Sequence, residues 1–206
     1  MTRPTLVFLG DSITAANRQD PDLDLPLGDG FVSMIAEDVA GTGVEVVNLG
    51  VNGDRARNLA AQVEQVRAVD NPLMATVYVG VNDTWRRFDS GQVTPDSDFM
   101  RDLMDAIDGL RAVGFEKVLL LGPFLLPLDE EQAEMVDDLE HRIELIRQVA
   151  EVTDTPLIEL LPVFEAATAQ HERGDLAPDG VHPSRLGHEL IRDAWWDGVG
   201  QDGLVP

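Results

Sequence analysis

Thr5-Leu6-Val7-Phe8-Leu9-Gly10-Asp11-Ser12-Ile13-Thr14 is the segment around which the rest of the chain is organised. A short apolar run ends at Gly10, and a polar, hydroxyl-bearing turn follows at once. The run is too short for a core helix and predicts a buried strand of a parallel sheet. In open α/β sheets, ligands bind at the carboxyl ends of the strands. The sequence therefore places Ser12 at that edge, although a serine after a strand also commonly forms a turn or caps a helix.

Strand-like and helix-like segments alternate through the rest of the chain. Further strands are predicted over 44–49, 74–79, 118–121 and 157–160. Helical apolar spacing recurs between them, with one long acidic helix over 130–152 and a closing helix over 184–196. This alternation predicts an α/β fold, with one five-stranded parallel sheet covered by helices on both faces. No repeat or linker interrupts residues 1–206, so we expect a single domain.

The net negative charge of the chain limits which molecules it can bind. The 206 residues include 38 acidic and 15 basic side chains, which give a formal net charge of −23. Such a chain repels nucleic acid and anionic membrane surfaces, so uncharged or cationic substrates are favoured. The absence of cysteine excludes disulfides and thiolate metal sites. No signal peptide or membrane-spanning run is recognised in the sequence, and a cytoplasmic location is the expectation.

Polar clusters follow several of the predicted strands. They are Asp11-Ser12, Gly53-Asp54 and Asn82-Asp83, and a fourth cluster, 179–182, lies late in the chain. All strand carboxyl ends of a parallel sheet point to one edge, so clusters that are distant in sequence can meet there. The sequence therefore predicts a composite site at this edge.

The composition of these clusters fits acyl transfer. A serine hydroxyl needs a base, histidine serves as one near neutral pH, and a carboxylate orients the imidazole. Ser12, His182 and Asp179 supply those groups, and Asp179 and His182 stand three residues apart. The tetrahedral oxyanion requires donors, for which the candidates are the N–H groups of Ser12 and Gly53 and the amide of Asn82.

Together these residues resemble the SGNH family of hydrolases, also called GDSL esterases. The resemblance covers nearly the whole chain, in sequence order: Gly10-Asp11-Ser12-Ile13-Thr14, Asn48 to Asp54, Gly80-Val81-Asn82-Asp83 and Asp179-Gly180-Val181-His182-Pro183. It implies a flavodoxin-like three-layer α/β/α sandwich. It also implies that Ser12, Gly53, Asn82 and His182 are the four name-giving residues and Asp179 the third triad member. No cofactor or metal is implied.

Within the family, the chain looks most like carbohydrate acetylesterases of the acetylxylan-esterase type. This likeness rests on 27–32, 85–89, His182-Pro183-Ser184 and Gly187-His188. It implies a small-molecule ester substrate and carbohydrate deacetylation, with Asp11, Arg18, Trp85 and Arg86 as candidate substrate contacts. Where that group often has an acidic residue and a glycine, this chain has Ala15 and Asn17, both expected on the pocket wall. A homo-oligomer is left open.

Other interpretations remain. A lysophospholipase-, thioesterase- or arylesterase-like member of the same family would share the blocks, and a carbohydrate-binding protein would need no triad. A two-metal phosphoesterase would require more histidine ligands than His182, and the Gly-x-Gly-x-x-Gly spacing of a dinucleotide site is absent.

Individual residues also have structural interpretations. Asp11 would brace its turn, Asn82, Asp54 and Asp83 would cap helices or fix loops, and His188 would pack. His141 and His171 would lie at the surface, and of Trp195 and Trp196 only one would face the core.

Overall fold

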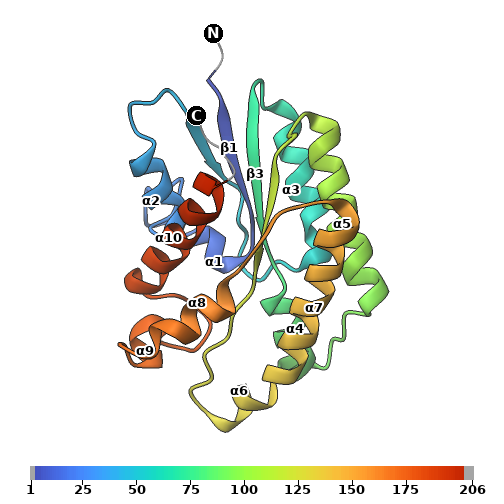
Figure 1. Ribbon diagram of the computed structural model, residues 1–206, viewed down its shortest axis with the longest axis vertical. Coiled ribbons are helices and arrows are strands. Elements are labelled where there is room, and N and C mark those ends of the chain that lie inside the picture. The colour runs from blue at the N-terminus through green and yellow to red at the C-terminus, as the bar shows by residue number, and fades with distance from the viewer. Residues whose placement is uncertain (1–2, 202–206) are drawn as a thin grey trace.

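The structure is a computed structural model that describes residues 3–201. Five strands form one parallel sheet in the order β2-β1-β3-β4-β5 (Figure 1). They are β1 (Thr5–Gly10), β2 (Glu45–Asn48), β3 (Pro72–Tyr78), β4 (Val118–Gly122) and β5 (Leu157–Glu159). This order is that of flavodoxin-like sheets, so the predicted fold class is confirmed.

The burial of β1 explains its uninterrupted apolar sequence. All six of its residues are buried. Leu6 and Phe8 join the core on one face of the sheet, whereas Val7 and Leu9 join the core on the other. Successive strand side chains point to opposite faces, so a strand covered on both sides must be apolar throughout.

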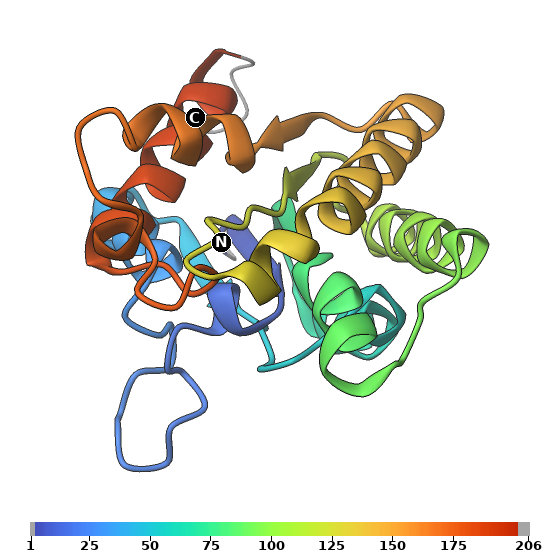
Figure 2. The same ribbon diagram turned by 90° about the horizontal axis from the view of Figure 1, so that it is seen from below.

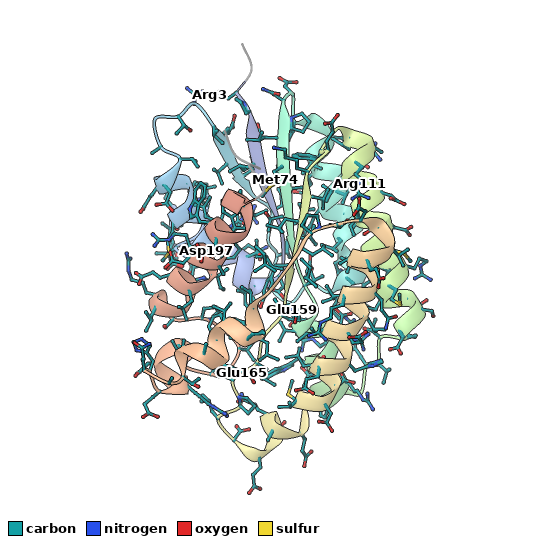
Figure 3. The ribbon with its side chains drawn as sticks, viewed as in Figure 1. Arg3, Met74, Arg111, Glu159, Glu165 and Asp197 are labelled. Atoms are coloured by element: carbon teal, nitrogen blue, oxygen red, sulfur yellow. The ribbon has the colours of Figure 1, made fainter. Side chains whose placement is uncertain are left out.

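Two helical layers cover the sheet (Figures 1 and 2). One layer contains α2 (Phe31–Asp38), α8 (Leu160–Ala167), α9 (Arg173–Leu176) and α10 (Arg185–Gln201). The other contains α3 (Leu59–Gln65), flanked by the 3₁₀ turns η1 (Ala56–Asn58) and η2 (Val66–Ala68), with α5 (Asp96–Val113) and α7 (Val136–Thr153). Met74 of β3 lies in the interior, whereas Glu165 and Asp197 project from the outer surfaces of α8 and α10 (Figure 3). Within residues 3–201, every helix is too short or too polar to cross a bilayer.

The long helix predicted over 130–152 is wrong, because the chain forms two helices there. These are α6 (Glu130–Glu134) and α7, separated by Met135. The Met135 N–H bonds the Gln132 carbonyl across three residues, and the Met135 side chain is buried. The bond to the third residue back replaces the bond to the fourth at this point, and a continuous 3.6-residue periodicity does not reveal such a break.

Helix α4 (Val81–Ser90) occupies a segment predicted only as a polar turn. Gly80 precedes it with φ of +127°, a backbone conformation that glycine adopts readily. Asn82 is therefore the second residue of α4 and does not cap it. Asn, Asp, Thr and Ser favour caps and turns in isolation, so local composition obscured this helix.

Shorter boundary differences occur elsewhere. Pro95 directly precedes α5 and is its N-cap residue. Pro162 lies inside the first turn of α8, where its missing N–H is tolerated. Helix α9 lies shortly before the Asp179–His182 turn, and α10 extends beyond the closing helix predicted over 184–196.

Candidate active site

Ser12 stands where β1 gives way to the short helix α1 (Ser12–Ala15). Asp11 caps this helix, since its Oδ1 accepts the Ile13 N–H at 2.9 Å. A Cβ at Gly10 would lie 2.4 Å from the Tyr78 carbonyl and 2.3 Å from Thr14 Oγ1. Only glycine therefore permits this tight exit from the strand, which leaves Ser12 half-buried at the sheet edge.

Ser12, His182 and Asp179 form one continuous hydrogen-bonded chain. Ser12 Oγ lies 3.0 Å from His182 Nε2, and His182 Nδ1 lies 2.6 Å from Asp179 Oδ2. Because the carboxylate faces Nδ1, that nitrogen carries the imidazole proton, and Nε2 is left to accept the serine hydroxyl proton. The structure thus brings together residues that are up to 170 positions apart.

The Asp179 carboxylate is held by its own loop. Its Oδ1 accepts the N–H groups of Val181 at 3.0 Å and His182 at 2.7 Å. Burial by itself would raise the pKa of Asp179, but these bonds and the His182 side chain outweigh it, and the pKa lies below its usual value. The carboxylate therefore stays charged at neutral pH.

A glutamine that the sequence did not mark supports this loop. Gln132 Nε2 donates to the Asp179 carbonyl at 2.7 Å, and the Leu126 N–H donates to the Gly180 carbonyl at 2.9 Å. Gly180 has φ of +81°, and a Cβ there would lie 2.5 Å from Gln132 Oε1. Helix α6 is thereby tied to the Asp179–His182 turn, a link that only tertiary contact reveals.

The predicted oxyanion donors face the same hollow as Ser12. Gly53 has φ of +78° and borders the cavity, as does Asn82. The Asn82 amide donates to the Asp54 carbonyl at 3.2 Å and lies 3.4 Å from Asp11 Oδ2. The amide nitrogen has two hydrogens, so its longer contact, to Asp11, must be exchanged for a bond to an oxyanion when Asn82 acts as a donor.

Three acidic residues near the site have structural contacts. Asp11 is fully buried, and its pKa is raised to about 7, chiefly by burial and then by the charges of Asp83 and Asp54. Asp83 is buried and accepts the Ala56 N–H at 3.2 Å, and Asp54 accepts from Gln62 at 2.7 Å. Burial also raises the pKa of both. Within residues 3–201, no group of three His, Cys, Asp or Glu side chains is arranged to hold a metal ion.

The cavity above Ser12 has a volume of about 750 Å³. Trp85 and Arg86 line it, at the position predicted for substrate contacts. Further residues on its wall are Ile13, Ala16, Asn17, Asp29, Asn52, Val81, Val181, Pro183, Arg185 and His188. The hollow thus combines one aromatic ring and a few small apolar side chains with many hydrogen-bonding groups.

Comparison with known proteins identifies the lineage of this site. The sequence pattern of the GDSL-like lipase/acylhydrolase family matches residues 8–190. The chain belongs to the GDSL-like lipase/acylhydrolase family.

The relatives of this GDSL-like enzyme are esterases. It is 27% identical to an acetylxylan esterase of Geobacillus stearothermophilus, over 95% of this chain and 93% of the relative. It is also 27% identical to esterase TesA of Pseudomonas aeruginosa, over 93% and 86% of the two chains. It is therefore a carboxylic ester hydrolase, not a non-catalytic carbohydrate-binding protein.

Solved structures agree with this assignment. The acetylxylan esterase Axe2 of Geobacillus stearothermophilus superposes with a TM-score of 0.83 at 26% identity, covering 97% of this chain and 95% of Axe2. LAE5, an alpha/beta hydrolase from the metagenome of Lake Arreo, superposes with a TM-score of 0.81 at 26% identity, covering 97% and 96%. Variants of Axe2 described as catalytic replace a serine, an aspartate and a histidine, of which the last two stand three positions apart.

Two of the predicted substrate contacts of the GDSL-like enzyme need correction. Asp11 is fully buried and is not part of the cavity wall, so it cannot touch substrate directly. Arg18 also lies outside the wall, and its Nη1 donates to the Gly50 carbonyl at 2.9 Å. Of the two departures expected on the wall, Ala15 is instead fully buried. Asn17 does line the cavity, with φ of +66°, a region that glycine favours.

His188 is the main wall residue that sequence reasoning missed. It is packed as predicted, with 7% exposure, a ring stacked on Phe31 and an Nδ1 that accepts the Phe31 N–H at 3.2 Å. Burial lowers its pKa to about 4, so the ring is neutral and its proton must sit on Nε2. The Gly187-His188 pair shortly after His182-Pro183 was the available sequence signal.

The remaining histidines and tryptophans match the sequence interpretation. His141 is exposed beside Asp96, and His171 is exposed. Trp195 is fully buried and donates to Thr76 Oγ1, whereas Trp196 is half-buried and donates to Asp38.

Proposed function

We propose that this esterase removes acetyl groups from carbohydrates or other hydroxyl-rich alcohols, with Ser12 as nucleophile, His182 as base and Asp179 as the orienting carboxylate. The observation that carries the reaction is the hydrogen-bonded chain from Ser12 Oγ through His182 to Asp179, which opens onto the cavity. The serine, aspartate and histidine described as catalytic in Axe2 support the same assignment.

In the acylation step, Ser12 Oγ attacks the ester carbonyl carbon while its proton passes to His182 Nε2. The carbonyl oxygen becomes an oxyanion, which accepts hydrogen bonds from the Ser12 and Gly53 N–H groups and the Asn82 amide. The bond from the carbonyl carbon to the alcohol oxygen then breaks, and the alcohol leaves with the proton from His182. Water repeats the sequence on acetyl-Ser12 and releases acetate.

Asp179 contributes by orientation and charge. Its Oδ2 keeps the imidazole proton on Nδ1, so that Nε2 faces Ser12 as an acceptor. Its lowered pKa keeps the carboxylate ionised, which stabilises the imidazolium formed in each step.

The cavity wall supports a hydroxyl-rich alcohol. Trp85 offers an aromatic face, Arg86 and Asn52 offer donors, and Asp29 offers acceptors. The neutral His188 ring adds a further N–H donor, because its Nδ1 is already occupied. A sugar presents an apolar face and several hydroxyls, which matches this combination. The acetylxylan esterase relative points to the same substrate class.

The mechanism is tested on Ser12 and Asn82. Ser12→Ala should abolish turnover, and an organophosphonate should label Ser12 alone in the wild type. Asn82→Ala should lower kcat by roughly 10²–10³ with KM little changed, the usual effect of removing one oxyanion donor. Labelling at Ser33 or Ser184, or a large KM rise at constant kcat, would refute these roles.

The substrate class is tested with p-nitrophenyl acetate, butyrate and octanoate beside acetylated xylose. Each CH₂ accommodated in an apolar acyl pocket would add about 0.8 kcal/mol of binding, roughly a fourfold gain. We expect kcat/KM to fall with chain length and acetylated xylose to be deacetylated. Octanoate outperforming acetate, with acetylated xylose intact, would instead favour a lysophospholipase- or thioesterase-like enzyme.

A further inference from the structure

The Gly53 N–H is part of the central peptide of a β-turn, and the orientation of that peptide differs between turn types. The Asp54 N–H bonds the Val51 carbonyl at 3.1 Å, which closes a four-residue turn. Gly53 has φ of +78°, whereas Asn52 is not among the residues with positive φ, and this combination defines a type II turn. In the type I form the Asn52–Gly53 peptide is flipped, so a carbonyl oxygen replaces the N–H. The positive φ of Gly53 excludes the type I form here.

The peptides around this central one are all held. The Gly50 N–H bonds Asn48 Oδ1 at 2.9 Å, and the Val51 N–H bonds the Gly10 carbonyl at 3.0 Å. Among the hydrogen bonds within residues 3–201, none reaches the Gly53 N–H. It is therefore available to an oxyanion, and its place depends on the contacts that hold the neighbouring peptides of the turn.

The side chains of two consecutive residues, Arg18 and Gln19, hydrogen-bond to the backbone of the turn and of Gly50 just before it. Arg18 Nη1 donates to the Gly50 carbonyl at 2.9 Å, and Gln19 Oε1 accepts the Asn52 N–H at 2.7 Å. The first bond anchors the entry to the turn, and the second anchors the Val51–Asn52 peptide, so together they fix where the turn lies. Arg18 is half-buried and its donor is charged, so its bond is the stronger of the two.

Hydrogen bonds also hold the loop that carries Arg18 and Gln19. Residues 17–29 form the loop that projects beside α1 in Figure 2. At its base, Asn17 Nδ2 donates to the Asp29 carboxylate at 3.0 Å, and Asn48 Nδ2 donates to the Leu27 carbonyl at 2.8 Å. These two bonds hold the ends of the loop, so the side chains of Arg18 and Gln19 contact the turn from a fixed backbone.

We propose that Arg18 and Gln19 are positioning residues that hold the turn Val51–Asp54 in place on the cavity wall that it shares with Ser12, and so keep the Gly53 N–H within reach of the oxyanion. This inference rests on the proposed function, in which Gly53 is an oxyanion donor. Arg18 acts through backbone groups of the turn and not on the substrate.

The test compares Arg18→Met and Gln19→Met, which keep the apolar stem but lose the polar contact, with Arg18→Lys and Gln19→Glu, which keep a donor or an acceptor. We expect Arg18→Met to lower kcat about tenfold and Gln19→Met about threefold, each with KM within about twofold of wild type. Arg18→Lys and Gln19→Glu should recover most of the loss. Asp24→Asn, an exposed position in the same loop, is the matched control and should leave both parameters unchanged.

A second readout separates positioning from general damage. Phosphonylation of Ser12 forms a tetrahedral adduct that uses the same donors, so its rate should fall in parallel with kcat. In a Gly53→Ala background, where positive φ is disfavoured, Arg18→Met should have little further effect. Gln19 is exposed, so Gln19→Met provides the test even if Arg18→Met fails to fold.

The inference is overturned if kcat and the phosphonylation rate are unchanged in both Met variants, or if KM rises at constant kcat, which would make Arg18 a substrate contact. Failure of the proposed function would look different, since Ser12→Ala would then remain active and wild-type Ser12 would resist the phosphonate.

Discussion

Asp11→Asn probes the buried carboxyl beneath the active serine. Asparagine has the same shape, and its Oδ1 can still cap the Ile13 N–H. It removes a group whose pKa is raised from 3.8 to about 7, chiefly by burial. The substitution should therefore change how stability depends on pH, in addition to any constant effect on packing.

The sign and size follow from linkage. A carboxyl with a raised pKa in the folded state contributes stability that is fully present below pH 3.8 and is lost as pH rises through about 7. A pKa difference of this size corresponds to about 4 kcal/mol in all, of which about 3 kcal/mol falls between pH 5 and pH 8.5. The asparagine variant has no such loss, so it should gain about 3 kcal/mol relative to wild type over this interval.

The assay is urea unfolding of both proteins at pH 5 and pH 8.5, followed by comparison of the two free-energy differences. Constant effects, such as an altered contact with the Asn82 amide 3.4 Å away, appear equally at both pH values and cancel. His188 titrates in both proteins and cancels as well. If the difference between wild type and variant is the same at pH 5 and pH 8.5, Asp11 does not bear the burial cost that its environment implies.

Three further outcomes are expected. Wild type should gain about 3 kcal/mol of unfolding free energy between pH 4 and pH 6.5, because His188, with its lowered pKa of about 4, is protonated in that window only in the unfolded chain. His188→Gln should lack this gain, and urea unfolding at pH 4.5 and pH 7 measures the difference. Asp179→Asn should reduce kcat by up to about 10⁴ with the fold intact, since the imidazole loses its tautomer control; single-turnover kinetics with matched circular dichroism would contradict this if acylation stayed fast. The net charge of −23 should make the melting temperature rise between 10 mM and 1 M NaCl as self-repulsion is screened, and a fall in melting temperature would count against repulsion as a destabilising influence.

Local sequence was informative wherever burial imposes a simple pattern. The apolar run before Gly10 must be a strand covered on both faces, and alternation with helical periodicity fixes a parallel sheet. The carboxyl ends of the strands in such a sheet share an edge, so the sequence alone predicts that Ser12, Gly53, Asn82 and His182 approach one another.

Local sequence failed where long-range contacts override propensity. The polar segment 81–90 forms α4, whose Trp85 and Phe88 pack against the core, and a change of hydrogen-bond pattern at Met135 separates α6 from α7. Arg18 resembled a substrate contact because side-chain chemistry alone does not reveal the partner, here the Gly50 carbonyl 32 positions away.

The sequence by itself determined the fold class, the family resemblance and the set of chemical groups, because these depend on residue type, order and periodicity. Only the tertiary structure decided the 3.0 Å contact of Ser12 with His182, the exclusion of Asp11 from the cavity and the neutral tautomer of His188. It alone also decided which side chains steady the Gly53 turn. Distance, burial and hydrogen-bond partner are properties of the packed chain, and residues far apart in sequence acquire them only when the sheet and its loops assemble.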